Sequence, residues 1–171
     1  MPPLHQIVFM TMWIASCCYA GLRGGAPERL AAAAQFGAGV FTLLSGLLGH
    51  VITDVAVGIS VALTDFSLFV ALTLIALFST RFWPISMASM TGCGLFGHFG
   101  RLIGPDILPD AYYATVAFWG YPTVILLAVA TSRHRIRLKR YGIDYAWVWN
   151  LPQRYRNGWS VDELAHTLPQ N

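Results

Sequence analysis

Five long apolar runs separated by short polar links make up the first 131 residues of the chain. A helix that crosses a bilayer needs about 20 mostly apolar residues, and the runs that reach or approach this length are residues 7–22, 30–53, 55–80, 82–103 and 111–131. Glycine or proline occurs where one apolar run ends and the next begins, for example at Gly24, Pro84 and Pro105. The pattern predicts an all-α membrane protein, a bundle of five transmembrane helices, followed by a tail at residues 132–171.

The composition indicates that a bilayer is the solvent of this bundle. Hydrophobic residues make up 56% of the 171 residues and charged residues only 11%, whereas a soluble domain carries about 25% charged residues. A soluble chain this short cannot bury so much apolar surface. The three cysteines, Cys17, Cys18 and Cys93, lie inside apolar runs without metal-ligand spacing, so no metal site is expected.

Positive charge predicts the orientation of the bundle. Lys and Arg favour the cytoplasmic side of a membrane protein. With the N-terminus outside and five spans, ten of the eleven basic residues fall inside and only Arg101 faces out. The tail is then cytoplasmic, and nucleic acid is not an expected partner, because the basic residues concentrate beside a span.

The tail combines a basic run with aromatic residues. We expect the basic run to continue the fifth helix into the headgroup zone, where it serves as a plain stop-transfer anchor. Specific contact with anionic lipid is the alternative. Trp147 and Trp149 are expected to lie on the membrane or on a partner. Ser160 and Glu163 form a capping box that predicts a short interfacial or docking helix. The basic run consists of Arg133, Arg135, Arg137, Lys139 and Arg140.

A short repeat places a histidine near the outer end of two spans. Gly46 begins a G-L-L-G-H motif that ends at His50, and Gly94 begins a G-L-F-G-H motif that ends at His98. Histidine is a common axial ligand of haem, and a glycine one turn earlier leaves room for a flat ring. The pattern is compatible with a haem or bacteriochlorophyll site. Glycines at this spacing are also typical of close helix packing, which is the competing interpretation.

Asp65 is the second candidate for chemistry, because it lies near the middle of the third span. An ionisable group at that depth is costly and indicates a function. By depth His98 is its best partner, and Arg101, nearer the outer surface, reaches it only in part. The functional interpretation is a proton or ion relay, and the structural one is a single polar tie between helices.

Several short motifs occur together in the chain. Residues 24–29 are GGAPER, residues 81–84 are RFWP and residues 119–122 are WGYP, and His98 and a PDAY motif at 109–112 lie between the last two. Together they resemble a group of small, uncharacterised, multi-span bacterial inner-membrane proteins over about residues 20–145. The resemblance implies a multi-pass protein of the bacterial inner (cytoplasmic) membrane. It carries over no known activity.

Three functions follow from these features. The first is a non-enzymatic accessory or scaffold subunit of a larger membrane complex, with other membrane subunits as partners. The second is a tetrapyrrole-binding protein that uses His50 and His98. The third is a small transporter or proton channel that uses Asp65. The chain contains no HExxH, GxSxG or Walker motif, so an enzyme is not the expected class.

Overall fold

The computed structural model describes residues 4–48, 54–103, 109–142 and 144–150, which form five α-helices and one short 3-10 helix. The α-helices are α1 (Leu4–Arg23), α2 (Ala26–Leu48), α3 (Asp54–Phe78), α4 (Trp83–Ile103) and α5 (Pro109–Tyr141). The 3-10 helix is η1 (Val148–Asn150). Within these ranges there is no β-strand. The predicted short helix around Ser160 lies outside the described residues, so its prediction is untested.

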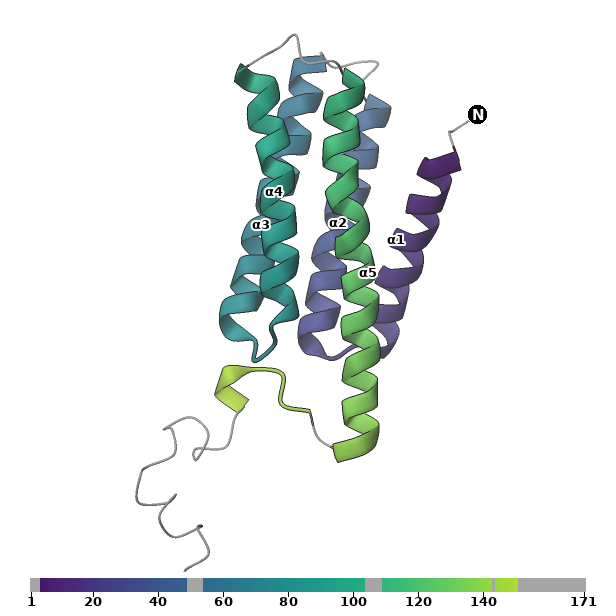
Figure 1. Cartoon of the computed structure of the whole chain (residues 1–171), viewed down its shortest axis with the longest axis vertical. Coiled ribbons are helices and arrows are strands. Elements are labelled where there is room, and N and C mark those ends of the chain that lie inside the picture. Colours follow the sequence, from purple (N-terminus) through teal and green to yellow (C-terminus); the bar gives the residue numbers. More distant parts are fainter. Residues whose placement is uncertain (1–3, 49–53, 104–108, 143, 151–171) are drawn as a thin grey trace, which may run out of the picture.

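The five helices run alternately up and down and form a closed ring (Figure 1). Each helix packs against the next one along the chain, and α1 packs against α5, which closes the ring. α2 also touches α5 across the bundle. The α1–α2 turn, the α3–α4 turn and the C-terminal part of α5 lie together at the bottom of Figure 1, which we call the lower end.

Local sequence explains where the helices begin and end. α2 begins at Ala26, four residues before the predicted start, because the first turn accommodates Pro27 and Glu28. Proline suits this position, where a backbone N–H has no helical partner, and an acidic residue suits the positive end of the helix dipole. α5 continues to Tyr141 through the basic run, as expected, and contains Pro122.

Close approach between helices depends on small residues. A Cβ at Gly39 on α2 would overlap the indole ring of Trp13 on α1, and one at Gly92 on α4 would lie 3.2 Å from the ring of Phe69 on α3. These contacts confirm that glycines bring helices together here. Gly46 and Gly94 are different, because a Cβ at either position would meet nothing within 4 Å.

Two of the helices in the described residues are long and apolar enough to cross a membrane by length and composition, namely Ala26–Leu48 and Ala56–Phe78. The prediction of membrane-spanning helices is therefore supported for two of the five segments. Many large apolar side chains of the bundle are exposed in the isolated chain, Leu63 on α3 and Phe96 on α4 among them. An apolar exterior of this kind is what a helix bundle presents to lipid.

Candidate functional site

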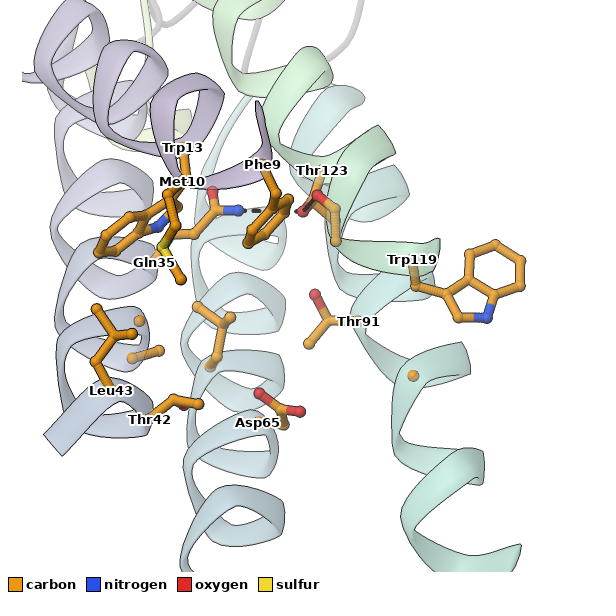
Figure 2. A pocket seen from close by; sticks show the side chains of 15 residues that line it. Phe9, Met10, Trp13, Gln35, Thr42, Leu43, Asp65, Thr91, Trp119 and Thr123 are labelled. Atoms are coloured by element: carbon orange, nitrogen blue, oxygen red, sulfur yellow. Dashed lines mark hydrogen bonds between the residues drawn. The ribbon is translucent and has the colours of Figure 1, made fainter. Parts of the chain in front are cut away.

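A cavity of about 230 Å³ lies inside the ring and is lined by residues of all five helices (Figure 2). Most of its lining is apolar or aromatic, and a few polar groups face it. This combination is typical of a site that accommodates a small ligand or ordered water. The polar or charged lining residues are Gln35, Thr42, Asp65, Thr91 and Thr123, and none of the lining residues is basic.

Asp65 and His98 form a pair beside this cavity. Nε2 of His98 lies 2.9 Å from Oδ2 of Asp65, and the His98 side chain is only 6% exposed. The contact predicted from the depths of the two residues is therefore confirmed. Antiparallel packing of α3 and α4 produces it, since Asp65 is 13 residues before the end of α3 at Phe78 and His98 is 15 residues after the start of α4 at Trp83.

Gln35 and Thr123 form a second polar contact at the cavity, across the bundle from α2 to α5. Nε2 of Gln35 donates a hydrogen bond of 3.1 Å to Oγ1 of Thr123 (Figure 2). The Thr123 hydroxyl in turn donates to the carbonyl of Gly120, one turn earlier in α5 and on the other side of Pro122. Oε1 of Gln35 is buried and has no hydrogen-bond donor among the described residues.

Charged groups from three segments meet at the lower end of the bundle. The carboxylate of Asp144, just after α5, accepts a hydrogen bond from Arg81 in the α3–α4 turn. His134 Nδ1 on α5 lies 2.5 Å from Oδ2 of the same carboxylate, and Nε of Arg137 lies 3.3 Å from Oδ1. We call Arg81, His134, Arg137 and Asp144 the Asp144 cluster.

The Asp144 carboxyl is ionised under ordinary conditions. Its burial raises the pKa, but hydrogen bonds from Arg81 and His134 and the positive charges of Arg81 and Arg137 lower it by more. The net result is a pKa below the usual value for an aspartic acid. The ionised Asp144 carboxylate therefore attracts the positive charges of Arg81 and Arg137 and ties the α3–α4 turn to α5.

The chain after α5 folds back against the α3–α4 turn (Figure 1). Ser79 and Trp147 form an isolated β-bridge, and the amide of Thr80 donates to the carbonyl of Ala146 at 3.2 Å. The ring of Trp149 packs on Phe78 with centroids 5.9 Å apart. Trp147 and Trp149, expected on the membrane or on a partner, thus have contacts with their own bundle.

Glu28 lies near the Asp144 cluster and is fully buried. Its side chain is 0% exposed, and neither carboxylate oxygen has a hydrogen-bond partner among the described residues. A charge without a partner in the interior of a protein is strongly unfavourable. Glu28 was not predicted as a functional residue, because it occurs in a polar link next to Arg29, where a charge is expected to be exposed.

The other sequence-based site predictions remain partly untested. His50 and the side chain of Arg101 lie outside the described part of the chain. The prediction that His50 and His98 both bind a tetrapyrrole is therefore untested. Gly46 is exposed, whereas Gly94 lines the cavity. In the basic run, Arg137 belongs to the Asp144 cluster, and the exposed members are Arg133, Lys139 and Arg140.

Three residues important to these sites were missed in the sequence. Asp144 follows a run of basic residues and has no recognisable motif, so only its contacts reveal its role. Gln35 carried a weak signal, since it is a single amide in a run of alanines and glycines. Glu28 carried one as well, because it lies seven residues before Gln35, on the same face of a helix.

The site supplies no ready-made metal centre, since no group of three or more His, Cys, Asp or Glu side chains suited to a metal ion occurs in the described residues. No protein-family model, curated protein or solved structure matches the chain.

Proposed function

We propose that the protein is a proton pathway through a bacterial inner membrane, formed by five membrane-spanning helices with Asp65 as the proton-binding residue. The single observation that carries this proposal is the cavity shared by all five helices, with the Asp65 carboxyl among its lining residues. The cavity has room for several waters, because a space of about 10–15 Å³ is enough for one water molecule. No basic residue in the lining competes for the carboxylate or repels a cation.

The dimensions of the bundle suit five spans. The helices are between 20 and 33 residues long, and at about 1.5 Å per residue the shortest of them is about 30 Å, the thickness of a hydrocarbon core. The lower end then faces the cytoplasm, because the exposed basic residues of α5 lie there. In this orientation the Asp144 cluster lies at the cytoplasmic surface and Asp65 in the bilayer interior.

The pairing of Asp65 with His98 suits proton transfer. Both side chains change their charge by binding one proton, and their contact of 2.9 Å is short enough for a proton to pass between them. A purely structural tie requires no open space beside it, whereas Asp65 also faces the cavity. The polar groups of Gln35 and Thr123 on the other side of the cavity would hold water in line with it.

A flux measurement in liposomes tests the proposal. Purified protein is reconstituted with an entrapped pH-sensitive dye, and a potassium gradient with valinomycin supplies the driving force. We expect the wild type to admit protons and Asp65→Asn to reduce the flux to that of protein-free liposomes. Ser67→Ala, an exposed residue two positions away on α3, is the matched control and should conduct normally. Undiminished flux through Asp65→Asn would refute the proposal, as would a wild type that admits no protons.

An accessory subunit of a membrane complex is the second candidate, and one observation favours it. The outer face between α2 and α3 has a groove of about 470 Å³ that is lined mainly by small side chains, such as Ala33, Ala34 and Gly37. Small residues of this kind let a helix of another subunit approach closely. Trp149, which was expected on the membrane or on a partner, instead contacts Phe78 of the same chain.

Co-purification after gentle extraction distinguishes the two candidates. A single large species that loses its partner in a Gly37→Leu variant supports the subunit, while a small species with proton flux supports the pathway.

The tetrapyrrole alternative stays a prediction. Nε2 of His98 is directed at Asp65, and an absorption spectrum of the same preparation, with or without a Soret band, tests whether His98 binds a tetrapyrrole.

A further inference from the structure

Glu28 is an acceptor without a donor. Its two carboxylate oxygens are buried in the first turn of α2, they make no hydrogen bond within the described residues, and no ion pair involves them there. The N-terminus of its own helix is favourable for a carboxylate in this position, but it does not replace a hydrogen-bond donor or a counter-ion. The environment therefore favours the binding of a positive charge at Glu28.

Across the bundle, the side chain of His134 on α5 borders Gly25 together with this carboxylate. A Cβ added at Gly25 would lie 2.8 Å from Cε1 of His134 and 2.9 Å from Oε2 of Glu28. Gly25 thus holds α5 and α2 together at this point, and a larger residue would push the imidazole and the carboxylate apart. Both side chains border the same small space, which belongs to the α1–α2 turn.

The contact with Asp144 fixes how His134 presents its ring. Because the Asp144 carboxyl is ionised, it accepts a hydrogen bond from Nδ1–H of His134. In a neutral imidazole the other nitrogen, Nε2, is then the acceptor. His134 therefore has a proton acceptor in the region of the α1–α2 turn, where the buried Glu28 carboxylate has no donor among the described residues.

We propose that Glu28 and His134 form a second proton-binding site, at the lower end of the bundle, in which the Glu28 carboxyl carries a proton and exchanges it with His134. The imidazole takes a proton from hydronium on Nε2, which leaves water, and passes it through one intervening water to an oxygen of Glu28. A carboxylate and an imidazolium thereby become a carboxylic acid and a neutral imidazole. No electron is transferred and no other bond breaks. A metal ion is a poor occupant, because only one carboxylate and one imidazole are available.

Other charged groups near the site are already engaged or exposed. On α1 and α2, Arg23 and Arg29 flank the turn, and both are exposed. Arg81 from the α3–α4 turn and Arg137 from α5 are directed at Asp144. The positive charge that neutralises Glu28 thus comes from a proton and not from a guanidinium.

Glu28 also faces the same way as the cavity-lining Gln35. The two residues are both buried and lie seven positions apart on α2, about two helical turns or 10.5 Å. Oε1 of Gln35 is a second buried acceptor without a donor among the described residues. The role of the site as the cytoplasmic end of the pathway through Asp65 rests on the proposed function, but the presence of a proton on Glu28 does not.

Infrared difference spectroscopy of the full-length protein in lipid tests the site directly. A protonated carboxyl has a carbonyl band that is separate from those of amides and carboxylates. We expect the wild type to show such a band that comes from Glu28. Glu28→Gln, a neutral side chain of the same shape, should lack the band, and Asp65→Asn, altered only in the bilayer interior, should keep it.

The His134→Asn variant tests the exchange step. Its amide N–H can still donate to Asp144, but it has no counterpart of Nε2. After transfer to D₂O we expect the Glu28 band to shift at least about tenfold more slowly than in the wild type, since a positioned acid–base group speeds proton transfer by that much or more.

The outcomes separate this site from the proposed pathway. Protonated-carboxyl bands that are all unchanged in Glu28→Gln, or a wild type without any such band, would overturn the proton on Glu28. Exchange in His134→Asn at the wild-type rate would overturn the role of His134. A wild type that shows the Glu28 band but conducts no protons would leave the site intact and remove the proposed function instead.

Discussion

The carboxamide of Gln35 reaches across the bundle to the hydroxyl of Thr123, so that α2 and α5 are joined by a buried hydrogen bond of 3.1 Å between non-neighbouring helices of the ring. Thr123→Val keeps the shape of the side chain but removes its oxygen. We expect this variant to lower the free energy of unfolding by about 1 kcal/mol, within the range measured for hydrogen bonds between membrane helices. Equilibrium unfolding in mixed micelles measures the change.

A double-mutant cycle with Gln35→Ala gives the control for this contact. If the bond exists, the two substitutions together should destabilise less than the sum of their separate effects. Strict additivity of the two variants would show that Gln35 and Thr123 do not interact.

The close contact between Gly39 and Trp13 predicts an unequal response to alanine along α2. Gly39→Ala should destabilise the bundle by about 1–3 kcal/mol, because the new methyl group overlaps the indole ring and overpacking has a cost of this size. Gly46→Ala is the matched control in the same helix, since its Cβ would meet nothing within 4 Å. It should be neutral or stabilising. Equal losses at the two positions would contradict the packing of α1 on α2.

The Asp144 cluster should hold the tail in a pH-dependent way. A carboxyl whose pKa is lowered by folding stabilises the folded state above its ordinary value of about 4, and this contribution disappears as the pH falls through the lowered pKa. The amide of Thr80, bonded to Ala146, reports on the contact. We expect its protection from hydrogen exchange to be full at neutral pH and to fall only below about pH 4.

Asp144→Asn provides the comparison. It removes the charge that Arg81 and Arg137 contact, so Thr80 should be poorly protected at every pH. If wild-type protection instead declined near neutral pH, the group responsible would not be Asp144.

The five-span arrangement predicts that the two ends of the bundle face opposite sides of the membrane. In a background with the three native cysteines replaced by alanine, His5→Cys on α1 and Lys139→Cys on α5 would each place a thiol at an exposed position. We expect a membrane-impermeant maleimide to label intact cells lacking their outer membrane at position 5, and to label position 139 only after permeabilisation. Labelling of both positions from the same side would require an even number of spans.

The positions of the helices were predictable because apolar length and glycine or proline breaks are local properties. The start of α2 was placed too late because Glu28 was taken as part of a polar link, whereas in the structure its helix begins at Ala26 and buries it. Local sequence shows that a residue is charged, but burial depends on which other helix lies beside it. Here that neighbour is α5, more than 100 residues away in the sequence at His134.

The candidate site was predictable only where depth in the bundle decides the partner. Asp65 and His98 lie at similar depths on consecutive antiparallel helices, so their contact follows from the spans themselves. The contacts of the Asp144 cluster cannot be predicted from depth in this way. Arg81 and Asp144 are 63 residues apart, and their meeting depends on how the chain turns back after α5. That turn includes Gly142, whose backbone has a positive φ of 72° and which no helical periodicity could reveal.

The closure of the ring by α1 and α5 has a consequence for how the protein is made. During synthesis α1 and α2 are complete long before α5, the helix that closes the ring, has been made. Until α5 is made, the cavity beside Asp65 lacks the side that α5 supplies. Translation of the last helix therefore completes the cavity, and a product truncated before residue 109 would lack the lining that Trp119, Gly120 and Thr123 provide.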